Sequence, residues 1–136
     1  MRRVALACVV LLAAAGAALA ITRFGRTAAL AAGCALIAVS LPLMALARIQ
    51  LGKSFSVAPK ATALVSHGVY SRIPHPLFTF LDIAVLGLIM VLRQPWLVLP
   101  WLALVAIHAW AARREARVLE RAFGDAYREY RANTWW

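Results

Sequence analysis

The residues of this chain that can take part in chemistry lie at the two ends of one long apolar stretch. The sequence Pro74-His75-Pro76 precedes an apolar hairpin over residues 77–112, and Glu115 follows the hairpin at once. Because a hairpin of two membrane spans returns to the side from which it started, the imidazole and the carboxylate are predicted to meet at one membrane surface. Such groups can exchange protons or bind a charged ligand. We therefore expect a functional site at that surface rather than a simple anchor.

The composition and the lengths of the apolar runs are typical of an integral membrane protein. The chain has 136 residues, of which 64% are hydrophobic, and its mean hydropathy is +0.78, whereas soluble domains are about half apolar. Four continuous apolar runs cover residues 4–21, 27–47, 77–92 and 96–112. A helix needs about 20 such residues to cross the hydrocarbon layer. The predicted fold class is all-α, a membrane helical bundle with about four transmembrane helices and a cytosolic C-terminal amphipathic helix.

The distribution of positive charge predicts how these helices are oriented. The formal net charge is +10, and fifteen residues are Lys or Arg. All of them lie before the first run, between the second and third runs or after the fourth run, except Arg23, Arg26 and Arg93 in the two short breaks. Because loops rich in Lys and Arg stay in the cytosol, we expect a multi-pass protein of the inner (cytoplasmic) membrane with both termini cytosolic. The same distribution argues against a nucleic-acid partner, because the charges follow the membrane topology.

The chain is interpreted as a single membrane domain, residues 1–136, with a scaffold and a core. Residues 1–47 hold the first two runs, which are rich in Ala and carry no charged residue in their interiors, and they are interpreted as a two-helix scaffold. Residues 48–136 hold the polar motifs. Within this core, residues 48–76 mix apolar side chains with Gly, Pro and Ser, which predicts a segment that packs along the cytosolic face. Cys8 and Cys34 lack metal-ligand spacing, so no metal is expected.

An acid and a histidine are predicted to face each other inside the hairpin. The tight turn Arg93-Gln94-Pro95 makes the third and fourth runs antiparallel neighbours, and counting from this turn puts Asp82 level with His108. Both residues would lie about 6–8 Å inside the cytosolic end. A charge such as Asp82 costs about 2.5 kcal/mol or more at the bilayer centre and less near the edge. Two interpretations stay open: a polar pair that lines a pocket, or a hydrogen bond that locks the hairpin.

The segment after the fourth run has the periodicity of an amphipathic helix. On a helical wheel its apolar positions share one arc; they are Ala112, Ala116, Leu119, Phe123, Ala126, Tyr127 and Tyr130. The arginines of this segment fall on the opposite side. Glu115 lies at the edge of the apolar arc and not among these charges. Because a carboxylate turned toward a packed surface requires a partner or a ligand, Glu115 is a candidate functional group.

These polar regions resemble the two halves of a family signature. The chain resembles the first half of the signature at Leu64-Val65-Ser66-His67-Gly68-Val69-Tyr70 and at His75-Pro76. It resembles the second half at Glu115, Leu119, Phe123-Gly124, Tyr127 and Tyr130. The signature is that of isoprenylcysteine carboxyl methyltransferases and bacterial phospholipid methyltransferases. The resemblance covers residues 64–130, with both halves in the expected order around one hairpin.

The resemblance implies an integral membrane methyltransferase that uses S-adenosylmethionine and acts on a lipid or isoprenoid substrate within the bilayer. The catalytic residues that it implies are His75 and Glu115. The implied cofactor-binding residues are Gly68, Tyr70, His75, Pro76, Glu115 and Tyr127. The expected substrate pocket holds Phe78, Asp82, His108 and Trp110. A carboxylate suits the cationic groups of this cofactor, and aromatic faces suit its adenine and its sulfonium.

Departures from the signature leave the methyl acceptor open. Pro74 stands where the family has an arginine, and Ala116 stands where it has a second glutamate. A carboxylate acceptor is already ionised, whereas a phenol or an amine needs a base, for which His75, His108 and Glu115 are the candidates. The alternative to an enzyme is a non-catalytic membrane scaffold or interaction protein that keeps the methyltransferase fold.

Overall fold

The structure, a computed structural model, describes residues 2–23, 25–52 and 68–135, with side chains from residue 7 onward. Most of the segment expected to pack along the cytosolic face, residues 53–67, lies outside the described residues, and so does the first half of the signature up to His67. Within the described ranges the regular elements are all helical. The predicted all-α class is therefore confirmed for this part of the chain.

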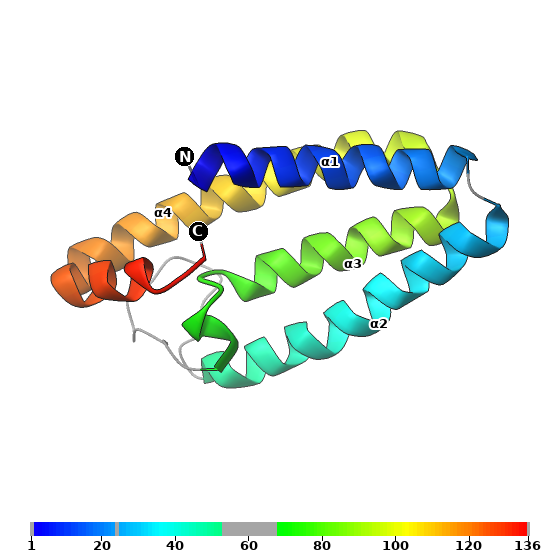
Figure 1. The fold of residues 1–136 in the computed structure, drawn as a ribbon. Coiled ribbons are helices and arrows are strands. Elements are labelled where there is room, and N and C mark those ends of the chain that lie inside the picture. Colours follow the sequence, from blue (N-terminus) through cyan, green and yellow to red (C-terminus); the bar gives the residue numbers. More distant parts are fainter. Residues whose placement is uncertain (1, 24, 53–67, 136) are drawn as a thin grey trace.

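Long helices that lie roughly alongside one another make up the fold (Figure 1). They are α1 (Arg2–Arg23), α2 (Arg26–Leu51), α3 (Pro76–Leu92) and α4 (Val98–Ala132), with short 3-10 turns η2 (Gly68–Ser71) and η3 (Pro95–Leu97). The central element is α3, which packs along α2 and also contacts α1 and α4. The far end of α4 extends beyond the start of α3 and then turns back toward it (Figure 1).

The lengths of these helices bear on the number of membrane spans. Among the described residues, Arg26–Leu51 and Pro95–Ala132 are long and apolar enough to cross a membrane. The helical stretches Ala7–Arg23 and Pro76–Leu92 are apolar but shorter. Two crossing helices are thus supported by length and composition, and four spans stay a prediction.

The helices α2 and α3 approach each other so closely that glycine is required on both sides. A Cβ atom on Gly33 would lie 2.6 Å from the carbonyl oxygen of Gly87, and a Cβ atom on Gly87 would lie 2.8 Å from the carbonyl oxygen of Gly33. Within lipid, helices associate through such close van der Waals contact, because the surrounding hydrocarbon removes most of the hydrophobic driving force. The Gly33–Gly87 contact therefore sets the distance between α2 and α3.

The turn between α3 and α4 is fastened to α1. Arg93 ends α3 in the left-handed conformation, with φ of 54°, and its guanidinium donates a hydrogen bond to the carbonyl oxygen of Ile21 at 3.2 Å. Beside this contact, Ala14 and Ala17 of α1 are buried in one apolar cluster with residues of α3 and α4. The predicted tight turn is present, and α1 covers the end of the hairpin that lies away from the polar motifs.

The glycine contact gives a prediction about packing. Gly33→Ala should destabilise the protein by about 1–3 kcal/mol, because the new methyl group overlaps the α3 backbone. Gly16→Ala is the matched control, since nothing lies within 4 Å of a Cβ at that helical glycine. Thermal unfolding in detergent measures both variants. Equal stability of the two variants would contradict the close approach of α2 and α3.

Candidate active site

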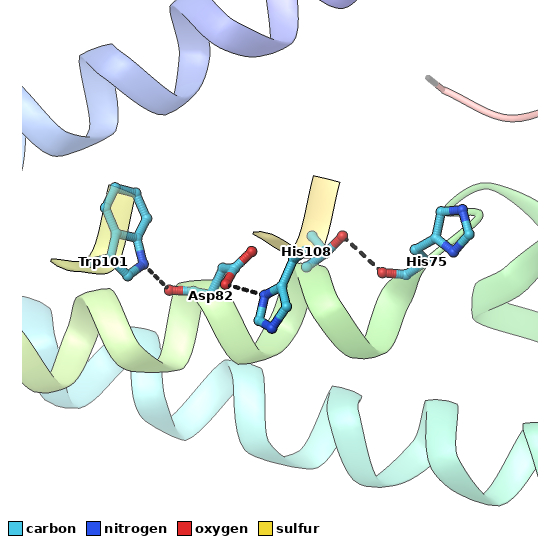
Figure 2. Close-up of polar contacts among 5 residues, drawn as sticks. His75, Asp82, Trp101 and His108 are labelled. Carbon is cyan, nitrogen blue, oxygen red and sulfur yellow. Dashed lines mark hydrogen bonds and ion pairs between the residues drawn. The ribbon is translucent and has the colours of Figure 1, made fainter. Parts of the chain in front are cut away.

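Two acid–histidine contacts join α3 to α4. Nδ1 of His75 lies 3.1 Å from Oε2 of Glu115, and Nδ1 of His108 lies 2.7 Å from Oδ1 of Asp82. The indole nitrogen of Trp101 donates to the carbonyl oxygen of Asp82 at 2.8 Å (Figure 2). On each helix successive partners are seven residues apart, which is close to two helical turns. The contacts therefore repeat along one continuous face of the antiparallel pair.

We call His75 and Glu115 the outer layer, and Asp82 and His108 the inner layer. A seven-residue step corresponds to about 10 Å along the helix axis. The outer layer lies where α3 begins and where α4 carries its first arginines, and the inner layer lies deeper in the apolar hairpin. The hairpin thus presents two polar levels at the end that the charge distribution predicts to be cytosolic.

The local sequence at the start of α3 fixes the outer layer. His75 is the N-cap residue of α3 and Pro76 is its first residue, where the ring of proline fits the helix without loss of a hydrogen bond. The Thr79 hydroxyl donates to the carbonyl oxygen of His75 at 3.1 Å. The His75 side chain is 12% exposed, whereas that of Glu115 is 42% exposed. The imidazole is therefore held in place, while the carboxylate remains accessible to a ligand.

An aromatic stack connects the outer and inner layers. The Phe78 ring stacks on the His108 ring, with centroids 4.8 Å apart and planes 13° apart. On its N-terminal side, Phe78 also stacks more loosely on His75, with centroids 6.2 Å apart. The side chains of Asp82 and His108 are each 14% exposed. Both the stack and the carboxylate restrict the orientation of the His108 ring.

The end of α4 returns to the beginning of α3. Gly124 interrupts the helix with φ of 50° and ψ of −118°, a conformation that side chains with a Cβ rarely adopt. Beyond it, the Tyr130 hydroxyl donates to the carbonyl oxygen of Tyr70 at 2.9 Å. The backbone N–H of Trp135 donates to the carbonyl oxygen of Arg72 at 2.9 Å. The Gly124 turn therefore places aromatic residues of the tail over the segment that leads into α3.

The turn η2 is held against α2 by a side-chain contact. The backbone N–H of Val69 donates to Oε1 of Gln50 at 2.8 Å. Gly68 has φ of 61°, and a Cβ at this position would overlap the Gln50 amide. Glycine at 68 thus has a structural reason, which is the close approach of η2 to the end of α2.

A cluster of tyrosines, Tyr70, Tyr127 and Tyr130, lies between this turn and the tail. All three side chains are buried. The Tyr127 hydroxyl is a buried polar atom with no hydrogen-bond partner among the described residues. Burial raises the pKa of Tyr70 to about 12 and also raises the pKa of Tyr127 and of Tyr130. The negative charge of Glu115 adds to each of these increases, so the outer layer lies near the cluster.

Most residues expected at the site lie at this end of the hairpin. The structure brings His75 to Glu115 and Asp82 to His108, and it places Phe78 beside both imidazoles. Pro76 is fully buried at the start of α3. Gly68, Tyr70 and Tyr127 belong to the neighbouring turn and tyrosine cluster. The roles assigned to these residues stay predictions, since their proximity does not identify a ligand.

Trp110 does not join this group. Its side chain is 58% exposed, and the guanidinium of Arg114 lies 5.8 Å from its ring centroid. Trp110 lies two residues from His108 on α4 and therefore on a different face of the helix. An exposed tryptophan beside an arginine suits a membrane–water interface better than a pocket.

Sequence reasoning did not find three contributors to the site. Trp101 fixes the backbone at Asp82, Gln50 holds η2, and Thr79 holds the carbonyl group of His75. The sequence spacing could have indicated Trp101, because residues 101, 108 and 115 are seven residues apart and therefore lie on one face of the helix. Nothing in the sequence pairs Gln50 with Val69, since this contact depends on how α2 and η2 come together.

Comparison with known proteins identifies the family. The family model described as phospholipid methyltransferase matches residues 28–126. The chain belongs to the phospholipid methyltransferase family. This result confirms the resemblance seen in the sequence motifs. No curated protein and no solved structure matches the chain.

Membership in the phospholipid methyltransferase family supports methyltransferase activity on a lipid-type substrate. The matched region begins in α2 and ends just after the Gly124 turn, so it contains both polar layers. Among the described residues, no group of His, Cys, Asp and Glu side chains could hold a metal ion. The polar groups of the site are therefore the acid–histidine pairs and the tyrosines.

The tyrosine cluster gives a prediction about stability. Tyr130→Phe should lower the free energy of unfolding by about 1–3 kcal/mol, because the carbonyl oxygen of Tyr70 loses its donor. Tyr127→Phe is the matched variant, and it should cause no loss, because its hydroxyl has no partner in the described part of the chain. Chemical unfolding in detergent measures both variants. A larger loss for Tyr127→Phe would show that the tail is arranged differently.

The same cluster predicts a dependence on alkaline pH. The three tyrosines of the chain are all in this cluster, and an unfolded chain releases their protons near pH 10. The folded protein retains these protons to higher pH, because burial raises the pKa of each tyrosine. The stability that the three neutral hydroxyl groups contribute is therefore fully present below about pH 10, and it is lost as the pH rises through the folded pKa of Tyr70, about 12. Ultraviolet absorbance of tyrosinate measures the titration. Ionisation near pH 10 in the folded protein would contradict the burial of the cluster.

Proposed function

We propose that this protein transfers a methyl group from S-adenosylmethionine to a lipid or isoprenoid-type acceptor at the cytosolic face of the inner membrane. Apart from family membership, one observation supports this proposal: in the outer layer, Glu115 contacts His75 at the end of the hairpin where α3 begins. Because the Glu115 side chain is 42% exposed, its carboxylate can bind a cationic ligand while it keeps its contact with His75. The aromatic cluster beside this carboxylate supplies the second half of such a site.

The chemistry of these residues fits the cofactor. S-adenosylmethionine would supply an electrophilic methyl group on a sulfonium centre, together with an ammonium, a carboxylate and an adenosine. Glu115 would bind a cationic group, and the unpartnered hydroxyl of Tyr127 would gain a hydrogen bond. The buried polar atom of Tyr127 is an observation of this chain that a purely apolar packing role leaves without explanation.

The protein residues would act mainly by binding and orientation. His75 holds Glu115 from the start of α3, and the Gly124 turn brings the tail tyrosines over the same place. Fixing two reactants at a short distance and with the correct alignment accounts for much of the rate in such reactions. Gly68 and Pro76 would contribute by shaping the backbone around the ligand.

The membrane arrangement is part of the proposal. We infer four crossing helices with both termini in the cytosol, because the N-terminus, the long middle break and the C-terminal segment carry most of the Lys and Arg residues. The outer layer then lies at the cytosolic surface, and the inner layer lies about 10 Å deeper in the bilayer. A lipid acceptor would reach them from the bilayer, and the water-soluble cofactor would reach them from the cytosol.

A non-catalytic role is the second candidate, and the signature departures favour it. Pro74, which stands at the position of the family arginine, is buried. Ala116 offers no carboxylate beside Glu115. The two proposals differ in one measurement, the binding of radiolabelled S-adenosylmethionine to the purified protein in detergent and in lipid. Binding supports the enzyme, and its absence in both media leaves the scaffold.

Substitution of the outer carboxylate tests the proposed site. Glu115→Gln keeps the size of the side chain and removes its charge, so we expect at least a tenfold loss of cofactor affinity, about 1.4 kcal/mol. Glu120→Gln is the matched control, because Glu120 lies on the same helix and pairs with the exposed Arg128. Titration with the labelled cofactor measures both variants. Equal affinities would remove Glu115 from the site.

The methyl acceptor can be identified from the methylated product. Incubation of the protein with a lipid extract and labelled methyl donor should yield a labelled lipid, and Glu115→Ala should abolish this labelling while the helical content is retained. Mass analysis of the labelled band identifies the acceptor class. Full labelling by Glu115→Ala would contradict a catalytic or binding role for this residue.

A further inference from the structure

We propose that His108 is the general base of this site, that Asp82 positions it, and that the acceptor is a neutral phenolic lipid rather than a carboxylate. This inference rests on the proposed methyl transfer and adds the acceptor chemistry to it. It starts from the inner layer, which the family assignment leaves without a role.

The geometry of the inner layer leaves one imidazole nitrogen available. Nδ1 of His108 faces Oδ1 of Asp82 at 2.7 Å, so an ionised Asp82 accepts a hydrogen bond from Nδ1–H, and the lone pair of the neutral imidazole is then on Nε2. The hydrogen bond of the His108 ring within the described residues uses Nδ1, and Nε2 points away from Asp82 (Figure 2). Trp101 donates to the backbone of Asp82 and so does not compete for the carboxylate. The same division of roles operates in the histidine–aspartate half of a catalytic triad.

The His108 ring is held by more than its hydrogen bond. Phe78 lies almost parallel to it with centroids 4.8 Å apart, so the ring cannot rotate freely. A contact that only joined α3 to α4 would be made at lower desolvation cost by two apolar residues, since buried acid–base pairs contribute little net stability. An imidazole that is fixed in orientation and has one open nitrogen is better explained as a proton acceptor.

Few other charges face this imidazole. Asp82 faces it from α3, His75 lies across the Phe78 ring, and Glu115 lies two turns further along α4 itself. The described side chains of α1 and α2 contain no acid and no histidine. Among the described residues, Asp82 is therefore the only carboxylate in direct contact with His108.

The depth of Asp82 and His108 in the bilayer favours an acceptor that enters as a neutral group. The inner layer lies about 10 Å below the outer layer along the helices, where a charged head group is costly to bring. A carboxylate acceptor would be ionised, would need no base and would be repelled by Asp82. A phenol enters as a neutral group and must lose a proton when its oxygen is methylated, which is the task that Nε2 can perform.

In the proposed methyl transfer, the phenolic oxygen forms a bond to the methyl carbon while the carbon–sulfur bond breaks. Sulfur keeps the bonding electrons as a neutral thioether. The phenolic proton passes to Nε2 of His108, and the carboxylate of Asp82 stabilises the resulting imidazolium. Deprotonation of His108 by water then restores the base.

The test uses the full chain in lipid nanodiscs with labelled S-adenosylmethionine. The acceptors are 4-dodecylphenol, dodecanoic acid, dodecylamine and 2-nitro-4-dodecylphenol, which ionises without help at weakly alkaline pH. We expect the unsubstituted phenol to be methylated at least tenfold faster than the acid or the amine. His108→Gln should reduce the turnover of this phenol by about 10²–10⁴-fold, with cofactor affinity within threefold of the wild type. The loss should be much smaller with the nitrophenol, which a merely structural role of His108 would not produce.

The positioning role of Asp82 has its own readouts. Asp82→Asn should lower turnover and displace the pH profile for 4-dodecylphenol, and the double variant with His108→Gln should be no slower than His108→Gln alone. Without donor or acceptor, ¹⁵N NMR of the histidines should show Nε2 of His108 unprotonated in the wild type and a redistribution of tautomers in Asp82→Asn.

Each outcome decides one proposal. Preference for dodecanoic acid or dodecylamine, failure to methylate the phenol by protein that binds the cofactor, or His108→Gln turnover within threefold of the wild type would overturn the assignment of His108. Nε2 found protonated at neutral pH would overturn it as well. Absence of cofactor binding by the wild type would instead refute the methyltransferase proposal itself.

Discussion

The contact between Asp82 and His108 sets the register of α3 against α4, and the other contacts of the site follow from that register. With these two residues level, the seven-residue repeat brings His75 to Glu115 toward the surface and brings Trp101 to the Asp82 backbone. A shift of α4 by one residue would rotate its partners by about 100° away from α3. Polar contacts in an apolar hairpin are well suited to fix such a register, because every other alignment leaves a buried charge without a partner.

The rest of the fold holds the hairpin without entering the site. The Gly33–Gly87 contact brings α2 close along one side of α3, and Arg93 ties the far turn of the hairpin to α1. These supports lie away from the acid–histidine pairs. The distance between the helices is therefore maintained by contacts that do not involve the signature positions Pro74 and Ala116.

Much of this arrangement could be predicted from the order of residues along the chain. The short turn after Leu92 requires antiparallel helices, and counting from it pairs Asp82 with His108 at the contact that the structure contains. The helical wheel of the tail also separates the buried Tyr127 and Tyr130 from the arginines, which are exposed except for the half-buried Arg131. These predictions succeeded because local periodicity and a short connection determine them.

Other features depend on contacts between distant segments, and periodicity does not reveal them. The tail was expected as a cytosolic C-terminal amphipathic helix, and in the structure α4 continues into it without a break until Gly124. Trp110 was expected in the substrate pocket, and its side chain is exposed in the structure. The bonds from Gln50 to Val69 and from Tyr130 to Tyr70 require the tertiary fold to be known.

The backbone bond from Trp135 to Arg72 has a consequence for how the protein is made. The packing of α1, α2 and α3 involves residues up to Leu92, whereas the tail can dock on the segment before α3 only after residue 135 has been synthesised. The tyrosine cluster, which needs residues from both segments, therefore forms later than the contacts among the first three long helices become possible.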